Sequence, residues 1–205
     1  MKLLVATSNP GKLVEVREIL AGCDLQLTSL AELGIAPPGE PFETFHENAA
    51  AKATACAARA RLWTLADDSG LCVDALGGRP GVHSARFAET DEARRRKLLD
   101  ALRGVPPDQR SAHFQCAVAL ASPDAQRIYR AEGRVDGRIA EAPRGTNGFG
   151  YDPLFLPREA PGRTLAELDS AEKNRLSHRG RALERLRALL QRLVRNGDLP
   201  PPEVA

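Results

Sequence analysis

The sequence predicts an α/β fold with a mixed β-sheet flanked by helices, and three observations support this prediction. An apolar run at residues 3–6 passes through polar turn residues into helical apolar spacing over residues 11–20. The same pattern returns where an Ala-rich helix, extending to about residue 61, precedes a strand at residues 63–66. Two later strands separated by Ser122-Pro123-Asp124 predict an antiparallel hairpin, so the sheet is mixed.

The first half of the chain carries clear local signals for each element. Residues 25–30 alternate in polarity as a strand does, and a loop rich in proline and glycine follows over residues 34–41. Thr44 and Glu47 have the spacing of a capping box, which predicts the start of the Ala-rich helix. A third helix is predicted over residues 91–103, with its basic run 94–97 forming a solvated face.

The second half begins with the predicted hairpin strands at residues 114–120 and 127–131. From Ser177 onward, regularly spaced leucines predict a final amphipathic helix that ends at Asn196-Gly197. We therefore expect one domain over residues 1–197 and a disordered tail over residues 198–205.

Composition excludes several classes of protein. With 29 basic and 27 acidic residues the net charge is +2, so bulk charge gives no case for nucleic-acid binding. The first apolar run is too short for a signal peptide, and no stretch approaches the roughly 20 apolar residues of a membrane helix. Four scattered cysteines without a C-x-x-C pair predict buried, reduced thiols rather than zinc ligands. These features predict a cytoplasmic protein.

The stretch Asp67-Asp68-Ser69-Gly70 places two adjacent carboxylates where the predicted strand 63–66 meets a loop. Adjacent acids repel, and a chain keeps them where a cation such as Mg²⁺ arrives with polyphosphate. A second acid would complete the site, and we expect it to be Glu40, with Glu43 of the same loop as the alternative. An ordinary turn capped by an Asp side chain is the alternative interpretation.

Two further segments suit phosphate. Ser8, Asn9 and Lys12 lie at the start of the first helix, where unpaired N–H groups favour an anion. The alternative is an ordinary N-cap with an exposed lysine. Asn48 and Lys52 are four residues apart and share one helix face, from which Lys52 could reach a phosphate, although a solvated lysine is the simpler interpretation.

Aromatic rings and donors gather in two later segments. The loop Gly148-Phe149-Gly150-Tyr151-Asp152-Pro153 would let a ring lie against a purine while Asp152 accepts from base or sugar, unless it is only a packed hairpin loop. Ser177, His178 and Arg179 offer donors suited to carbonyl oxygens, unless they are only helix caps.

Seven motifs, in this order, resemble the inosine/xanthosine triphosphate pyrophosphatase family. The resemblance extends from Met1 to about Val194 and lies in residues 7–12, 44–49, 67–71, 75–81, 84–86, 148–153 and 177–180. It implies an elongated mixed sheet in two lobes, a nucleotide in the cleft between them, and a homodimer. It also implies Mg²⁺-dependent hydrolysis of ITP, dITP and XTP to the monophosphate and pyrophosphate.

The resemblance also implies residue roles. Asp68 would be the proton acceptor and a metal ligand, Glu40 the second metal ligand, and Asp67 a supporting carboxylate. His83 departs from the family, whose members commonly carry tyrosine there; this affects a dimer or loop contact rather than the chemistry. The substrate-binding residues would be Thr7, Ser8, Asn9, Lys12, Lys52, Ser69, Phe149, Gly150, Tyr151, Asp152, Lys173, His178 and Arg179.

Two alternatives differ from this prediction. The related septum-inhibition nucleotide pyrophosphatases cleave dTTP or UTP, but their opening usually reads Ala-Ser-x-Ser-Pro-Arg-Arg, unlike residues 7–12 here. The second alternative is a module that binds a nucleotide or RNA without catalysing a reaction. Asp67 and Asp68 argue against it, because carboxylates next to phosphate weaken binding unless a metal is present.

Overall fold

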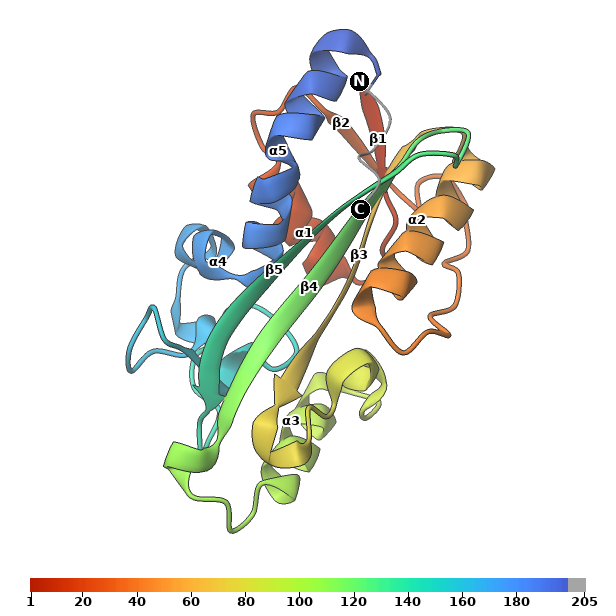
Figure 1. Ribbon diagram of the computed structural model, residues 1–205. Helices are drawn as coiled ribbons and strands as arrows, with labels where there is room; N and C mark the ends of the chain where they lie inside the picture. Colours follow the sequence, from red (N-terminus) through yellow and green to blue (C-terminus); the bar gives the residue numbers. More distant parts are fainter. Residues whose placement is uncertain (199–205) are drawn as a thin grey trace. The chain divides into compact units, whose positions relative to one another are not determined.

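The computed structural model describes residues 1–198, and these contain a six-stranded sheet in the order β2-β1-β3-β4-β5-β6 (Figure 1). β1 pairs in parallel with both β2 and β3, whereas β5 and β6 are antiparallel. The predicted mixed sheet is confirmed. The strands are β1 (Lys2–Val5), β2 (Gln26–Ser29), β3 (Trp63–Val73), β4 (Ser111–Ala121), β5 (Ile128–Ile139) and β6 (Phe155–Pro157).

The helices follow the sequence signals, and the predicted α/β class is confirmed. Asn9 and Thr44 are the N-caps of the first two helices, each accepting a backbone N–H three residues on. The short helix α4 and the short strand β6 have no counterpart among the predicted elements. The helices are α1 (Pro10–Ile19), α2 (Phe45–Ala60), α3 (Asp91–Ala101), α4 (Ser170–Leu176) and α5 (His178–Asn196).

β3 is longer than predicted. It continues through Asp67 and Asp68 to Val73, so the prediction that the two acids lie where a strand meets a loop is wrong. Residue 70 of this strand is a glycine because the Gly81 carbonyl oxygen approaches it closely, and a Cβ there would collide with that oxygen. The hairpin strands β4 and β5 also extend beyond the predicted ranges.

The chain divides into two compact units. Unit 1 comprises the described residues 1–68, 116–133 and 181–198, and unit 2 comprises residues 69–115 and 134–180. The division falls between Asp68 and Ser69, which are consecutive residues of β3.

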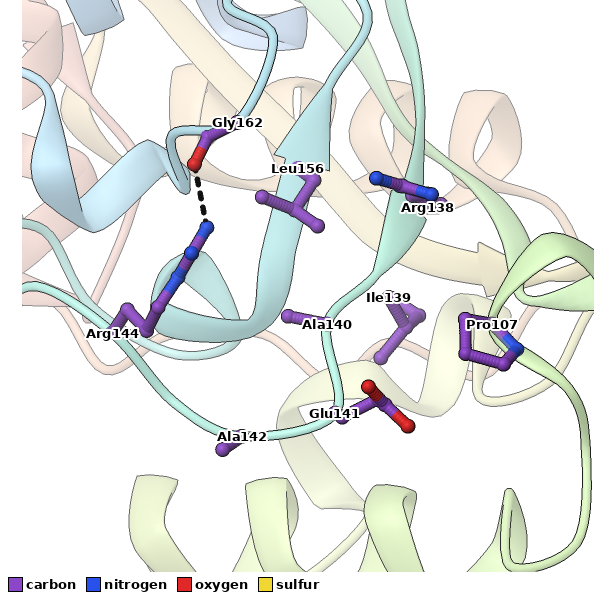
Figure 2. A pocket seen from close by; sticks show the side chains of 9 residues that line it. All are labelled: Pro107, Arg138, Ile139, Ala140, Glu141, Ala142, Arg144, Leu156 and Gly162. Atoms are coloured by element: carbon purple, nitrogen blue, oxygen red, sulfur yellow. Dashed lines mark hydrogen bonds between the residues drawn. The ribbon is translucent and has the colours of Figure 1, made fainter.

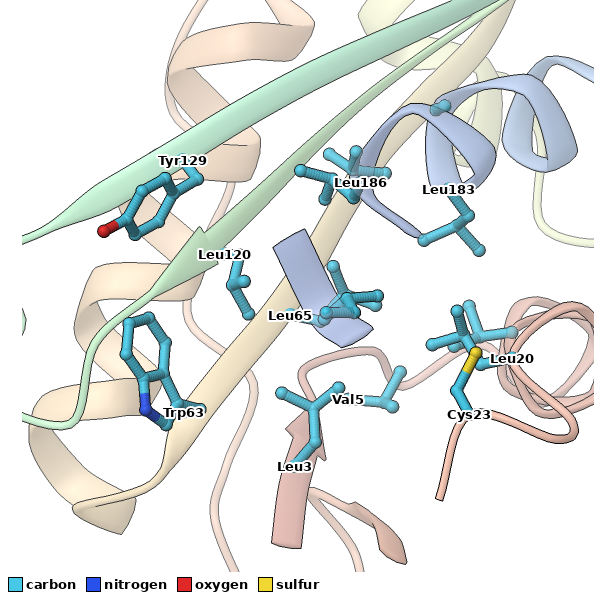
Figure 3. Packing of buried hydrophobic residues seen from close by; sticks show 14 of the residues in the cluster. Leu3, Val5, Leu20, Cys23, Trp63, Leu65, Leu120, Tyr129, Leu183 and Leu186 are labelled. Atoms are coloured by element: carbon cyan, nitrogen blue, oxygen red, sulfur yellow. The ribbon is translucent and has the colours of Figure 1, made fainter. Parts of the chain in front are cut away.

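The core of unit 1 lies on one side of β1 and β3. Leu3 and Val5 point to the same side because strand side chains alternate, and they pack with Leu65 (Figure 3). Leu183 and Leu186 of α5 cover this side, as the predicted leucine stripe requires. Helix α2 lies on the other side of these strands (Figure 1).

The core of unit 2 forms around the second half of β3. Leu71 and Val73 pack with Leu98 of α3 and with Leu102, the residue that follows the helix. The predicted solvated face at residues 94–97 is wrong in part. Arg94 and Arg95 are half-buried because both donate hydrogen bonds within unit 2, whereas Arg96 is exposed.

Three further predictions concern the whole chain. All four cysteines are buried and free, as predicted. No helix among residues 1–198 is both long and apolar enough to cross a membrane. Of the predicted tail, Asp198 is described and pairs with Arg127 at 2.6 Å, while residues 199–205 lie outside the described part.

Candidate active site

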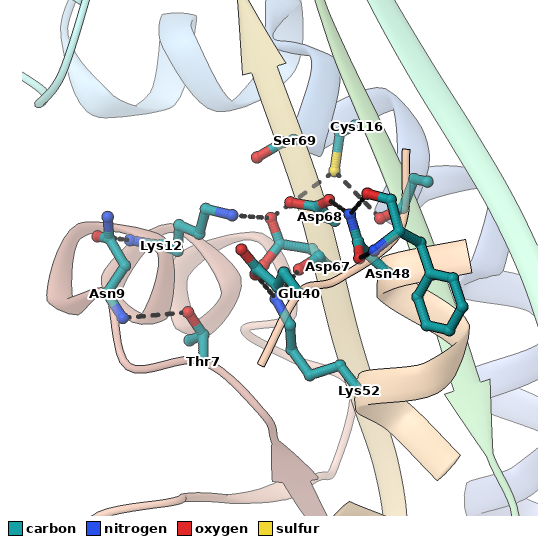
Figure 4. Close-up of polar contacts among 12 residues, drawn as sticks. Thr7, Asn9, Lys12, Glu40, Asn48, Lys52, Asp67, Asp68, Ser69 and Cys116 are labelled. Carbon is teal, nitrogen blue, oxygen red and sulfur yellow. Dashed lines mark hydrogen bonds and ion pairs between the residues drawn. The ribbon is translucent and has the colours of Figure 1, made fainter. Parts of the chain in front are cut away.

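The two adjacent acids of β3 are held by different helices of unit 1 (Figure 4). Side chains of consecutive strand residues point to opposite sides. Asp67 Oδ2 lies 3.0 Å from Lys12 Nζ of α1, and Asp68 Oδ2 accepts from Asn48 Nδ2 of α2 at 3.0 Å. Both acids are buried, with 5% and 3% of their surface exposed. The strand therefore separates two carboxylates that are neighbours in the sequence.

Lys52 joins the loop before α2 to β3. Its Nζ donates to the carbonyl oxygen of Asp67 at 2.9 Å and also to the Glu40 carboxylate. Burial alone would lower the pKa of Lys52, but the charges of Asp67 and Glu40 outweigh it and raise the pKa. Glu43 is exposed, so the structure brings Glu40 rather than Glu43 to these acids.

Asn48 is a site residue for which sequence reasoning predicted no role. Its side-chain amide accepts from the Phe42 N–H at 3.0 Å and donates to the Phe42 carbonyl at 3.0 Å, besides its bond to Asp68. Only 1% of its surface is exposed. Asn48 therefore ties the loop that carries Glu40 to the carboxyl group of Asp68. Its position one helical turn before Lys52 was the available signal.

We call Glu40, Asp67 and Asp68, with Lys12 and Lys52, the carboxylate set. Three carboxylates against two lysines give it a formal charge of −1. Burial raises the pKa of Asp68, as does the charge of Glu40, while Lys12, Lys52 and Asn48 act in the opposite direction. An added cation would offset this residual negative charge.

The carboxylate set fits a metal that takes only part of its shell from protein. No group of three or more His, Cys, Asp or Glu side chains that could hold a metal occurs within residues 1–198. Mg²⁺ is bound by one or two carboxylates, with substrate phosphates and water completing its shell. Glu40 and Asp68 match that requirement in number and in ligand type.

The segment before α1 contains the N-cap of the alternative interpretation but not its exposed lysine. Asn9 is a cap, because its Oδ1 accepts from the Lys12 N–H at 3.1 Å, and its own N–H donates to Thr7 Oγ1 at 3.2 Å. Ser8 is exposed. Lys12 is not a solvated lysine, since it is paired with Asp67 and only 14% of its side chain is exposed.

In unit 2, two predicted cations lie against the ring of Phe149, and we call Phe149, Asp152, Lys173 and Arg179 the Phe149 set. Lys173 Nζ lies 4.8 Å and the Arg179 guanidinium carbon 5.9 Å from the ring centroid of Phe149. Asp152 Oδ2 accepts from Lys173 Nζ at 2.5 Å and from the Phe149 N–H at 2.8 Å. Arg179 Nη2 also donates to Ser69 Oγ at 2.9 Å.

The loop backbone makes these contacts possible. Gly148 has φ +74°, and a Cβ there would collide with Asp152 Oδ2, so only glycine suits this position. Tyr151 lies in the core of unit 2, where its hydroxyl donates to the Ser84 carbonyl at 3.0 Å. Burial raises the pKa of Tyr151, so it is a neutral donor. Its ring supports the loop from the core.

His178 and Arg179 begin α5 and are buried. The imidazole of His178 stacks on Phe114, with ring centroids 4.7 Å apart and planes 8° from parallel. Ser177 Oγ accepts from the Gly180 N–H at 3.0 Å, which caps this helix start. The stacking fixes the ring plane of His178.

A surface cavity of about 300 Å³ lies elsewhere in unit 2, beside β6 (Figure 2). Arg144 at its margin donates to the Gly162 carbonyl at 2.7 Å. None of the predicted site residues lines this cavity. Its lining residues are Pro107, Arg138, Ile139, Ala140, Glu141, Ala142, Arg144, Leu156 and Gly162.

Comparison with known proteins decides the family. The model of the Ham1 family matches residues 3–189, which cover most of the chain. The chain belongs to the Ham1 family. A Ham1 relative from Bacillus subtilis, named dITP/XTP pyrophosphatase, is 47% identical over 192 residues, covering 92% of this chain and 96% of its own. Another with the same name, from Geobacter sulfurreducens, is 50% identical, covering 91% of this chain and 94% of its own.

A solved Ham1 structure agrees with the fold. The HAM1 protein from Coxiella burnetii superposes with a TM-score of 0.83 at 41% identity, covering 94% of this chain and 99% of its own. The predicted family is therefore confirmed, and the mixed sheet with flanking helices is the Ham1 fold.

Proposed function

We propose that this chain is a nucleoside-triphosphate pyrophosphatase that hydrolyses ITP, dITP and XTP to the monophosphate and pyrophosphate. Relatives that are 47% and 50% identical over more than nine-tenths of the chain carry the name dITP/XTP pyrophosphatase. The observation that carries the proposal is the pair of buried acids in β3, each held by a different helix and bordered by two lysines.

Residues of unit 1 take the triphosphate. Lys12 and Lys52 offset phosphate charge, and Thr7, Ser8 and Asn9 lie at the start of α1, where N–H groups favour anions. Glu40 and Asp68 would hold Mg²⁺, which supplies positive charge to the triphosphate oxygens. Asp67 orients both lysines, one through its carboxylate and one through its carbonyl oxygen.

Asp68 is the proton acceptor. Burial raises its pKa, and a raised pKa makes a carboxylate a better base towards water. The water oxygen attacks the α-phosphorus in line with the leaving oxygen, its proton passes to Asp68, and the bond to the β-phosphate oxygen breaks. Pyrophosphate leaves with the bonding electron pair, so no covalent intermediate is required.

Residues of unit 2 take the base, the sugar and further phosphate oxygens. The purine lies against Phe149, and His178 and Arg179 donate hydrogen bonds to its 6-keto oxygen. ATP carries a 6-amino group at that position, which cannot accept these hydrogen bonds. Ser69 and Lys173 contact phosphate. Gly150, Tyr151 and Asp152 complete the pocket for base and sugar, with Tyr151 acting from the core.

Three further predictions concern the cellular location, the oligomeric state and the place of the nucleotide. A cytoplasmic location is inferred from the cysteines and the apolar pattern of the sequence, and a homodimer is inferred from the resemblance. Light scattering after size exclusion tests the homodimer. The cleft between two lobes also stays a prediction.

The first experiment measures pyrophosphate release from ITP, XTP, GTP, ATP and dTTP, with Mg²⁺ and with excess chelator. We expect Mg²⁺-dependent release confined largely to ITP and XTP. A preference for dTTP would transfer the chain to the neighbouring pyrophosphatase class. ITP binding without release at saturating Mg²⁺ would favour a binding module.

The metal ligand has its own matched pair of variants. Glu40→Gln removes a charge from the carboxylate set, whereas Glu43→Gln changes an exposed residue of the same loop. We expect the Mg²⁺ concentration for half-maximal activity to rise about tenfold in Glu40→Gln, as for loss of one charged ligand. Equal Mg²⁺ requirements in the two variants would remove Glu40 from the metal site.

A further inference from the structure

Gly150, at the centre of the loop of residues 148–152, is held at both backbone polar groups by side chains of α3. Its N–H donates to Asp91 Oδ2 at 2.7 Å, and its carbonyl accepts from Arg95 Nη1 at 2.8 Å. Gly150 has φ +60°, a conformation that glycine adopts without strain. Two side chains four residues apart on one helix therefore clamp a single residue of the loop.

The clamp has its own support. The second oxygen of Asp91 pairs with Arg94 Nη1, and Arg94 Nε donates to the Ala88 carbonyl at 2.9 Å. Asp91 is also in the first turn of α3, where the helix dipole favours a carboxylate. Both oxygens of Asp91 are thus engaged, and the carboxylate is oriented before it meets the loop.

The residues on either side of Gly150 differ in what holds them. Tyr151 is fixed from the core by its hydroxyl bond to the Ser84 carbonyl. Phe149 is half-buried, and its side chain is contacted by the cations of Lys173 and Arg179. The Phe149 N–H donates to Asp152 Oδ2 and the next N–H, of Gly150, donates to Asp91, so the backbone on both sides of Phe149 is held and sets the direction of its ring.

We infer that Asp91 and Arg95 are positioning residues for base recognition, acting by fixing Gly150 and through it the ring of Phe149. This inference rests on the proposed function, in which the purine lies against that ring. Neither side chain is among the residues proposed to contact substrate. Their removal is expected to weaken binding of the base while leaving binding of the phosphates and the chemical step intact.

The test uses the full chain with Asp91→Ala and Arg95→Ala, and Arg96→Ala as the matched control. Arg96 is the next residue of α3 and is exposed. KM and kcat are measured for ITP, XTP and ATP, together with inhibition by inorganic tripolyphosphate, which has phosphates but no base. Asp91→Asn is added because its amide oxygen still accepts from the Gly150 N–H.

We expect KM for ITP to rise about tenfold in Asp91→Ala and Arg95→Ala, the size expected for loss of one hydrogen bond to a charged group. Because KM for ITP rises, the preference for ITP over ATP should fall. We expect kcat to change by less than about twofold and inhibition by tripolyphosphate to stay the same. Asp91→Asn recovers part of the loss. Unchanged KM, or equal weakening of ITP and tripolyphosphate, would overturn the inference.

Amide hydrogen exchange of Gly150 gives a readout that needs no substrate. Its N–H is bonded to Asp91, so exchange is expected to be faster in Asp91→Ala than in Arg96→Ala. Equal exchange in the two variants overturns the clamp itself. If the wild-type chain releases no pyrophosphate from ITP or XTP, the proposed function fails, and exchange still decides whether the clamp exists.

Discussion

The carboxylate set of unit 1 and the Phe149 set of unit 2 differ in the sign of their charge. In unit 1, Glu40, Asp67 and Asp68 outnumber two lysines, so the formal charge is −1. In unit 2, Lys173 and Arg179 outnumber Asp152, so the formal charge is +1. Both sets are largely buried, where charge interactions are stronger than in water.

This difference assigns different work to the two sets. On its formal charge, the carboxylate set repels a triphosphate unless a cation accompanies it, so we expect the proposed metal dependence to originate in unit 1. The Phe149 set attracts phosphate without a metal and presents an aromatic face as well. Substitutions in the carboxylate set should therefore alter metal-dependent turnover. Substitutions in the Phe149 set should alter which nucleotide is accepted.

The largest effect is expected for Asp68→Asn. The amide keeps the bond to Asn48 possible but cannot accept a proton from water, so kcat should fall about a hundredfold or more. Nucleotide affinity and the thermal unfolding midpoint should stay close to those of the wild type. Steady-state pyrophosphate release checks this, with Glu43→Gln as the control. Near-normal turnover would remove Asp68 from the role of base.

Arg179→Ala should have the next largest effect, on selectivity. Arg179 lies beside Phe149 and donates to Ser69, and a lost charged hydrogen bond corresponds to about 10- to 100-fold. We expect the ratio of kcat/KM for ITP to that for ATP to fall by this factor. Arg175→Ala changes an exposed arginine of α4 and serves as the control. An unchanged ratio would show that Arg179 does not recognise the base.

Lys12→Ala should weaken triphosphate binding about five- to tenfold, because a partly exposed charge is screened by solvent. The carboxylate set becomes more negative and attracts a cation more strongly, so the Mg²⁺ concentration for half-maximal activity should fall. KM for ITP is measured at several Mg²⁺ concentrations beside Lys2→Ala, an exposed lysine of β1. An unchanged KM would count against a phosphate contact by Lys12.

Tyr151→Phe should have the smallest kinetic effect, since the hydroxyl acts in the core of unit 2. Loss of its bond to the Ser84 carbonyl should lower the free energy of unfolding by about 1 kcal/mol. Denaturant titration measures this value, and KM for ITP should change by less than about twofold. A large rise in KM without a stability change would mean that the hydroxyl contacts substrate.

Local signals predicted the helices well because caps and apolar spacing act within a few residues. Thr44 caps α2 as its spacing to Glu47 predicts, and four of the five leucines of α5 are buried, the fifth being partly buried. The continuation of β3 was missed because Asp, Ser and Gly favour turns in isolation. Burial of Leu71 and Val73 outweighs that local preference.

The sequence predicted which residues belong to the candidate site but not which residues hold them in place. The motifs include Lys12, Lys52 and Asp68, so these residues could be predicted. The contact of Asp91 with Gly150 could not, because it joins residues 59 positions apart. No periodicity or spacing reports such a contact. The basic run that contains Arg95 resembles a solvated helix face in sequence, and only the fold shows which of its members turn towards the loop.

The placement of the two acids in the middle of β3 makes the chemistry depend on odd and even positions along a strand. Asp67 meets α1 and Asp68 meets α2 because consecutive residues alternate sides. Deleting one residue between Trp63 and Ala66 would turn each acid to the opposite side of the strand without altering the charge of the chain. Deleting two would restore their sides but would move both acids about 6.6 Å along the strand, away from Lys12 and Asn48. Natural insertions and deletions in this stretch are therefore expected to be rare.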